Sequence, residues 1–338
     1  RGHDSAAVFF ILVAFLLIVT PTAGIVVPSL DAGYRILVQK PVGTQHQVLE
    51  TDFHGGSPVI VPCKISLVDL LYEQVSLAER IKAQDWMSDT TKQAALDKLS
   101  TFYVKIGYPN KWKDLSGLSV DPSKSYYDNI QACRKYWNRY DIAQKAGKPV
   151  DRDEWFMTPQ TVNAYYNPPT NEICFPAGIL QYPFFDAKAD DAFNYGAIGV
   201  VIGHEMTHGF DDQGRHYDKS GNMCDWWTSA DANNFDERTG KYADFFSNIK
   251  VLPDLNGNGR LTLGENLADH GGLQVAYTAF KNATKNSKPA DKDGYTADQR
   301  FFMAYAGVWA GNITDEEIRN RTKSDPHSLG RWRVNGAL

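Results

Sequence analysis

The sequence predicts an α+β fold that is mainly helical, with a small sheet beside one buried helix. The apolar residues have a helical period in three segments, namely residues 68–84, 88–99 and 125–147. Two β-rich runs in residues 161–180 flank an Asn-Pro-Pro-Thr-Asn turn, which indicates a hairpin. Residues 197–208 start with an apolar run that only single glycines interrupt, a pattern typical of a buried helix.

The length of the chain predicts more than one structural unit. It has 338 residues, whereas domains mostly contain about 100–200. We divide it into residues 1–27, a signal peptide or membrane anchor; 28–65, unassigned; 66–150, a helical segment; and 151–338, the part that carries the chemistry. Ser88 stands at the start of the predicted helix over residues 88–99 and is a plausible N-cap.

Composition excludes some classes of function. The net charge is −5, from 35 basic and 40 acidic residues, and no block of Lys and Arg is present, so nucleic acid is not an expected partner. The cysteines form no C-x-x-C pair, which argues against a cysteine zinc site and leaves any disulfide optional. These cysteines are Cys63, Cys133, Cys174 and Cys224.

The N-terminal segment bears on location. Residues 6–19 are uncharged and strongly apolar, and the run extends to residue 27. Its length lies between a signal-peptide core of about 7–15 residues and a membrane span of about 20. A buried core helix is the alternative. With a signal peptide or an anchor, the rest of the chain lies outside the cytoplasm, whether secreted, periplasmic or membrane-anchored.

Candidate chemistry starts at the sequence His-Glu-Met-Thr-His. On a helix His204 and His208 are i and i+4, so both imidazoles point to one place, and imidazole nitrogen is a good zinc ligand. Glu205 projects about 100° around the helix and can reach a water on the metal. The alternative is an ordinary helix with two hydrogen-bonded histidines and a surface glutamate.

A catalytic zinc site needs a third protein ligand. The metzincin pattern requires Gly at 211 and His at 214, but this chain has Asp211 and Gly214, so that pattern is excluded. Glu265 and Asp269, on a later predicted helix, are again i and i+4. One of them can bind zinc while the other accepts a hydrogen bond from a ligand imidazole.

Two other interpretations compete for Glu265. Thr262 and Glu265 match a capping box at the start of a helix that runs to about residue 280. Residues 254–265 also match a calcium loop that begins at Asp254. Pro253 disfavours the helix that should enter such a loop, and only one carboxylate lies in its first five positions, so we interpret this stretch as a turn.

Several motifs together resemble the neprilysin and endothelin-converting-enzyme family of zinc endopeptidases, which are of the gluzincin type. They are HEMTH followed by GFDDQGR, GENLAD with a trailing GG, VNAYYNPPTNEICFPAGILQ, DWMSDTTKQAALDKL and VKIGYP. The resemblance covers residues 68–338. It implies a zincin-like catalytic domain and cleavage of oligopeptides on the amino side of apolar residues.

The resemblance also implies residue roles. One zinc ion per chain would be held by His204, His208 and Glu265, with Glu205 as general base for the zinc-bound water and Asp269 as the supporting carboxylate. His327 and Arg333 would stabilise the transition state and a substrate carbonyl. Asn163 and Ala164, on an edge strand, would bind the substrate backbone. An apolar pocket would be formed by Ile179, Phe184, Val200, Val201, Val308 and Trp309.

The chain departs from this family in two respects. Family members carry a large helical lid before the catalytic part, of which residues 68–148 represent little, so we expect Ile179, Phe184 and Trp309 to be more exposed than in a full-length relative. His270 stands where the family usually has an uncharged residue, and we expect an extra imidazole near the metal that alters its electrostatics. The alternative functions are a zinc-stabilised peptide-binding fragment without turnover and a calcium-binding structural protein. The sequence leaves the oligomeric state open.

Overall fold

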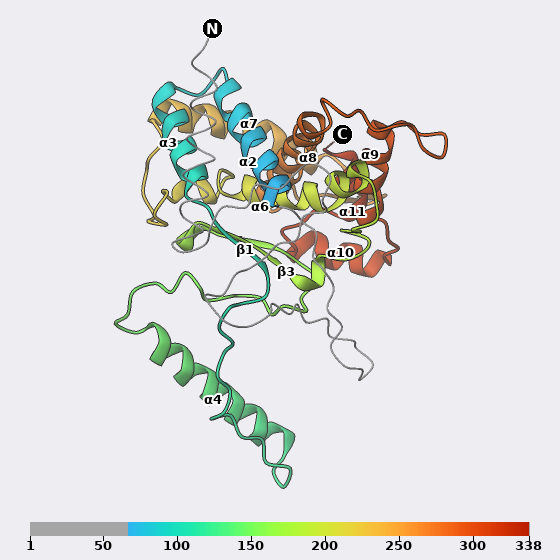
Figure 1. The fold of residues 1–338 in the computed structure, drawn as a ribbon. Helices are drawn as coiled ribbons and strands as arrows, with labels where there is room; N and C mark the ends of the chain where they lie inside the picture. The colour runs from blue at the N-terminus through green and yellow to red at the C-terminus, as the bar shows by residue number, and fades with distance from the viewer. Residues whose placement is uncertain (1–66, 338) are drawn as a thin grey trace, which may run out of the picture.

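The structure is a computed structural model that describes residues 67–337 (Figure 1). Its helices are α2 (Leu67–Ala83), α3 (Asp89–Ser100), α4 (Tyr126–Lys145), α5 (Asp191–Asn194), α6 (Val200–His208), α7 (Ser229–Ser247), α8 (Leu263–Ala283), α9 (Ala297–Val308), α10 (Asp315–Ser324) and α11 (Gly330–Asn335). Its strands are β1 (Tyr103–Gly107), β2 (Tyr165–Asn167), β3 (Glu172–Pro176), β4 (Lys250–Leu252) and β5 (Leu255–Asn256). The predicted mainly helical α+β fold is confirmed.

Local sequence signals account for several of these elements. Ser88 and Ser125 are the N-caps of α3 and α4, and their side chains accept hydrogen bonds from Thr91 N and Asp128 N. The β2–β3 hairpin forms around a turn in which Asn171 has a φ of 47°, a conformation that Asn tolerates well. The N-cap at Ser88 and the hairpin agree with the sequence prediction.

The larger sheet has the strand order β1-β3-β2. Strand β3 pairs in parallel with β1 and antiparallel with β2, and Glu172 lies opposite both Tyr103 and Asn167. All five residues of β3 are buried, as expected of a central strand. Strand β2 is therefore an edge strand, which leaves one of its sides free for another chain segment.

Helices α6 and α8 pack closely against each other at the centre of the fold. A Cβ atom on Gly203 would lie 2.8 Å from Gly272 O, and one on Gly272 would lie 2.5 Å from His204 N. Only glycine permits this backbone approach. The first turns of α8 consequently lie against the histidine-bearing face of α6.

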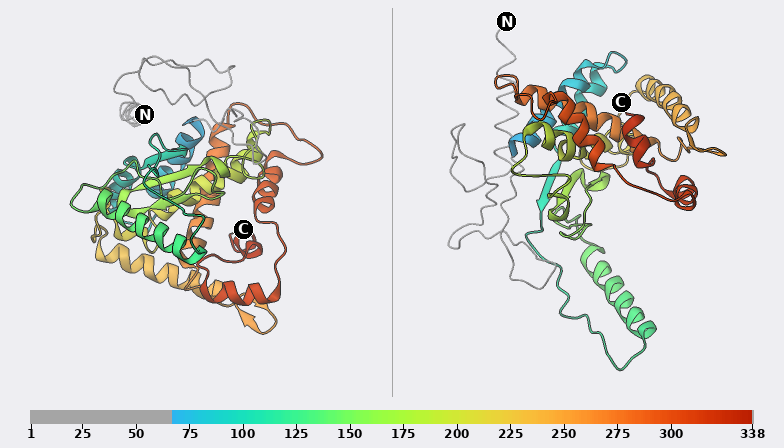
Figure 2. Two further views of the ribbon diagram at one scale, coloured as in Figure 1. Left: turned by 90° about the horizontal axis from the view of Figure 1, so that it is seen from below. Right: turned by 90° about the vertical axis from the view of Figure 1, so that its right-hand side faces the viewer.

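Two apolar clusters form the core. The first contains side chains from α2, α3, the sheet and α6, and the second contains side chains from α8, α9 and the π-helical segment Tyr195–Gly199. Residues of α2, α3 and β1 thus share a core with the part of the chain after residue 151. Helix α4, in contrast, has no buried residue and projects away from the other helices (Figure 2). The predicted boundary at residue 150 stays a prediction.

Some predictions concern other parts of the chain. Within residues 67–337 no helix is both long and apolar enough to span a bilayer. The predicted signal peptide or anchor (residues 1–27) and residues 28–65 lie outside the described residues, as does Cys63. Cys133, Cys174 and Cys224 are free thiols.

Candidate metal centre and peptide cleft

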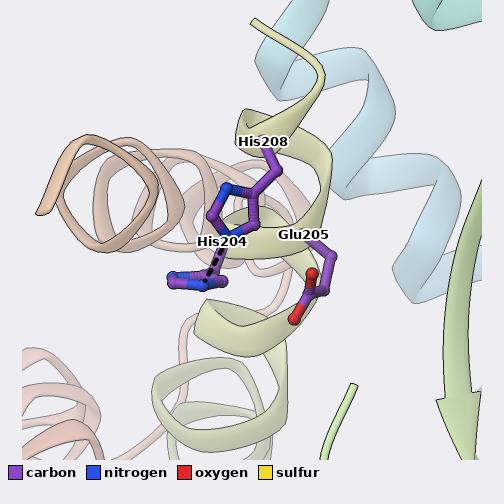
Figure 3. Close-up of side chains that lie close together, drawn as sticks. All are labelled: His204, Glu205 and His208. Atoms are coloured by element: carbon purple, nitrogen blue, oxygen red, sulfur yellow. Dashed lines mark hydrogen bonds between the residues drawn. The ribbon is translucent and has the colours of Figure 1, made fainter. Parts of the chain in front are cut away.

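Helix α6 brings the two predicted histidine ligands together. The Nε2 atoms of His204 and His208 are 3.0 Å apart, and the two rings are perpendicular. Figure 3 shows that both imidazoles and Glu205 project from α6 into the same space. The three side chains have candidate ligand atoms within 4.8 Å of one another.

Glu265 supplies a third donor from α8. Its Oε2 atom lies 3.2 Å from His204 Nε2 and 3.6 Å from His208 Nε2. With the 3.0 Å between the imidazoles, these distances bracket the edge of about 3.4 Å of a tetrahedron with metal–ligand bonds of about 2.1 Å. Glu265 Oε2 is buried and lacks a hydrogen bond of good geometry. The donor set N, N and O therefore fits a zinc ion.

Carboxylates fix the tautomer of both imidazoles. His204 Nδ1 lies 2.9 Å from Asp269 Oδ1, and His208 Nδ1 lies 2.6 Å from Asp211 Oδ2. A proton on each Nδ1 leaves Nε2 with its lone pair directed towards the common point. Burial alone lowers the pKa of His208, but the hydrogen bond to Asp211 and the contact with Glu265 raise it well above its ordinary value.

Arg333 anchors Asp269 in turn. Its Nε and Nη2 atoms donate to the two carboxylate oxygens at 2.7 and 2.6 Å, a bidentate pair in which both residues are buried. The guanidinium also lies over the Trp309 ring, 3.8 Å from its centroid. Burial favours the neutral form of Asp269, but the charge of Arg333 and the bond to His204 hold its pKa below the ordinary value.

His327 and Glu205 face the same centre. His327 Nε2 is 3.2 Å from Glu265 Oε2, and its Nδ1 is 2.8 Å from Asp325 Oδ1. The hydrogen bond to Glu265, with a smaller effect of Asp325, raises the pKa of His327 and favours the imidazolium, which carries an N–H on both nitrogens. Glu205 is 5 % exposed, and this burial raises its pKa. A carboxylate with a raised pKa is well suited to accept a proton near neutral pH.

A cleft of about 790 Å³ surrounds this centre and is lined by every residue that the sequence analysis selected for the site. Its lining includes the predicted substrate-binding residues Asn163, Ala164, Ile179, Phe184, Val200, Val201, Val308 and Trp309. Ile179 is 3 % exposed because it packs in the first core cluster. Its greater exposure relative to a full-length family member stays a prediction. Phe184 and Trp309 are half-buried.

Asn163 and Ala164 precede the edge strand and are not part of it. Strand β2 starts at Tyr165, where its pairing with Cys174 begins. The backbone at Asn163 and Ala164 pairs with no strand in the described part of the chain. Both residues nevertheless line the cleft.

The structure argues against two alternatives that the sequence left open and corrects the expectation for His270. The Thr262 side chain caps no N–H of α8, because its hydroxyl donates to Asn258 O and accepts from Asn266 Nδ2. Glu265 faces the histidines, whereas Asp254 pairs with Arg319 at 2.8 Å, so the calcium loop is not assembled. His270 lies outside the cleft, in contact with the Gln274 side chain and with its ring centroid 5.9 Å from that of Tyr242. Burial, with the charge of Arg80, lowers the pKa of His270.

Sequence reasoning missed the roles of Asp211 and Asp325. Asp211 entered the analysis only as evidence against the metzincin pattern, although it is the first acidic residue after His208. The general rule that a ligating histidine has a carboxylate or carbonyl partner would have selected it. Asp325 precedes His327 by two residues and also accepts a hydrogen bond from its backbone N–H at 2.9 Å.

Comparisons with known proteins agree with this geometry. Residues 163–338 and 73–109 both match peptidase family M13. The chain is 41 % identical to neprilysin-11 of Caenorhabditis elegans over 80 % of its own length and 33 % of the relative's. It is 42 % identical to endothelin-converting enzyme 1 of Mus musculus over 77 % of its own length and 35 % of the relative's.

Solved structures give the same result. The inhibitor complex of the zinc metalloprotease ZMP1 of Mycobacterium tuberculosis superposes with a TM-score of 0.75 at 43 % identity, covering 80 % of this chain and 42 % of that one. PepO of Lactobacillus rhamnosis gives a TM-score of 0.71 at 34 % identity, covering 80 % of this chain and 41 % of that one. The chain spans about a third of the length of the curated relatives it matches. On its sequence and its fold, the chain belongs to peptidase family M13.

Proposed function

We propose that this chain carries the catalytic part of a zinc endopeptidase that binds one zinc ion and cleaves oligopeptides on the amino side of apolar residues. The observation that carries the proposal is the triangle formed by His204 Nε2, His208 Nε2 and Glu265 Oε2, with the Glu205 carboxylate beside it. When bound, zinc polarises a scissile carbonyl and lowers the pKa of a coordinated water to about 7.

Glu205 is the proton carrier in this proposal. Its carboxylate accepts a proton from the attacking water and then passes it to the leaving amine, as expected of a buried base with a raised pKa. His327 and Arg333 supply donors for the negative charge that develops on the carbonyl oxygen. Asp325 holds the His327 ring and Asp269 holds the Arg333 guanidinium, so both donors are fixed before substrate binds.

The cleft accounts for the proposed substrate class. A peptide can lie as an extra strand along Asn163 and Ala164, where main-chain hydrogen bonds place few demands on its sequence. The buried side chains of Ile179 and Val200, with Phe184, form an apolar wall that favours an apolar residue after the scissile bond. The apolar run at residues 6–27 supports action outside the cytoplasm, either secreted, periplasmic or membrane-anchored.

The Glu205→Gln substitution tests the proposal. We expect the variant to retain about one zinc per chain by metal analysis, because Glu205 is not assigned as a ligand. Its cleavage of a quenched peptide library should fall by about 10²–10⁴-fold or more. Glu237→Gln is the matched control, since Glu237 is an exposed glutamate on α7 that pairs with Lys241 at the surface.

Two outcomes would contradict the proposal. Wild-type turnover by Glu205→Gln would remove Glu205 from the mechanism. A native chain that binds zinc and peptides without cleaving them would instead be a zinc-stabilised peptide-binding fragment.

A further inference from the structure

A buried lysine on α3 holds the segment that follows the metal helix. Lys98 is 1 % exposed, and its Nζ donates to the carbonyl oxygens of Gly209 at 2.6 Å, Gly214 at 2.8 Å and Tyr217 at 2.7 Å. These bonds use all three donors of the ammonium group. One side chain thus ties together both ends of the loop from residue 209 to residue 217.

This loop determines where the Asp211 carboxylate lies. Asp211 Oδ1 accepts hydrogen bonds from Gly214 N at 2.7 Å and Gln213 N at 2.9 Å. Its Oδ2 is then directed to His208 Nδ1 at 2.6 Å. The orientation of the His208 ring therefore depends on the loop backbone that Lys98 binds.

The main chain of Lys98 is tied to the wall of the cleft. Asn171 Nδ2 donates to Lys98 O at 3.2 Å, and Tyr166 donates its hydroxyl proton to Asn171 Oδ1 at 2.9 Å. Tyr166 lies on β2 and lines the cleft. The rings of Tyr166 and Phe210 lie 5.7 and 5.5 Å from the ammonium and exclude water from it. Hydrogen bonds in such a dry environment hold their partners firmly.

We infer that Lys98 is a positioning residue for the metal centre: through the loop carbonyls and Asp211 it sets the His208 imidazole for metal binding. The inference rests on the proposed zinc site. Lys98 connects a helix in the N-terminal segment that matches family M13 with a loop in the C-terminal segment that matches the same family. No metal ligand lies on α3, so the effect of Lys98 on the metal is indirect.

The test measures metal affinity in the native chain and in Lys98→Met, which keeps the length of the side chain but has no donor. Zinc affinity is measured by chelator competition, and the geometry of the site by the visible absorption of bound Co²⁺. We expect zinc to bind about 10–100-fold more weakly, as for other partners of ligating histidines, with an altered Co²⁺ spectrum. Asp211→Asn should weaken zinc binding by a similar factor. Because both residues act on His208 through the same loop, the double variant should bind zinc only slightly more weakly than either single variant.

Asp231→Asn is the matched control for a general loss of stability. The Asp231 carboxylate binds Ser88 and Thr91 at the opposite end of the same helix. This variant should lower the unfolding temperature but leave zinc affinity and the Co²⁺ spectrum unchanged. Zinc affinity that falls equally in Asp231→Asn and Lys98→Met would overturn the inference.

The remaining outcomes are also distinct. If Lys98→Met does not fold, Asp211→Asn takes its place in the comparison with Asp231→Asn, and native zinc affinity in Asp211→Asn would overturn the inference. A native chain that binds no zinc would instead refute the proposed function. Native zinc binding with equal affinity in Lys98→Met would refute the role of Lys98 alone.

Discussion

One buried carboxylate joins the N-termini of two helices and should control acid stability. Asp231 is 3 % exposed, and it accepts hydrogen bonds from Ser88 N at 3.0 Å, Thr91 Oγ1 at 2.6 Å and Thr228 Oγ1 at 2.7 Å. Ser88 and Thr228 are the N-caps of α3 and α7. Both helix dipoles favour a negative charge at this point.

The pKa of Asp231 gives the expected magnitude. Burial raises it, but the hydrogen bonds from Ser88, Thr91 and Thr228 outweigh burial and lower it from 3.8 to about 2. A depressed folded-state pKa adds stability above the unfolded value, and this stability is lost as pH falls through the folded pKa. At about 1.4 kcal/mol per pKa unit, the ionised carboxylate contributes about 2.5 kcal/mol at pH 7, about 1.3 at pH 3 and about 0.4 at pH 2.

We therefore expect Asp231→Asn to lower the free energy of unfolding by about 2–3 kcal/mol at pH 7, with the difference from the native chain shrinking below pH 4. Urea unfolding followed by far-ultraviolet circular dichroism, at several pH values between 7 and 2, measures this difference. Asp236→Asn is the control, because Asp236 lies on the same helix with an exposed side chain that pairs with Arg215. A difference between native and Asp231→Asn that stays constant from pH 7 to pH 2 would refute the reasoning.

Two further predictions concern the cleft. Glu265→Ala should empty the zinc site because two imidazoles alone hold the ion poorly, whereas Asp254→Ala loses only a surface pair with Arg319 and should keep zinc and activity. Metal analysis and peptide cleavage measure these effects. Calcium-dependent thermal stability that disappears in Asp254→Ala would restore the calcium interpretation. Phe184→Ala should reduce kcat/KM for substrates with Phe or Leu after the scissile bond by roughly tenfold or more, relative to substrates with Ala there. Equal losses for both substrate classes would show that Phe184 does not contact that residue.

The sequence predicts the parts of the site that depend on local spacing. His204 and His208 share a face because they are i and i+4 on one helix, and the same spacing places Glu265 and Asp269 together. That α6 and α8 meet is not a local property. It depends on the contact between Gly203 and Gly272, and the family motifs identify it only because related chains contain both segments.

Contacts between distant residues explain most of what the sequence did not reveal. Lys98 and Gly209 are 111 residues apart, and no periodicity indicates that a lysine on an amphipathic helix will be buried. Strand β1 follows α3 directly, but its parallel partner is β3, in which Glu172 lies opposite Tyr103 although it is 69 residues later in the sequence. The capping box failed for a related reason, because the Thr262 hydroxyl bonds to Asn258 and Asn266 instead of the first turn of α8.

The two histidines that face the metal position are held in the same way, by residues from opposite ends of the described chain. Each imidazole binds a carboxylate through Nδ1, and each carboxylate depends on a buried basic side chain: Asp269 directly on Arg333, and Asp211 through loop carbonyls on Lys98. Burial lowers the pKa values of the two imidazoles, but hydrogen bonds to Asp269, Asp211 and Glu265 raise them above the ordinary value, so these carboxylates favour positive charge at the centre. Buried carboxylates are costly unless a cation balances them. A divalent ion at the Nε2–Nε2–Oε2 triangle would supply that positive charge in place of protons, so the carboxylates that orient the ligands would also favour a bound metal ion.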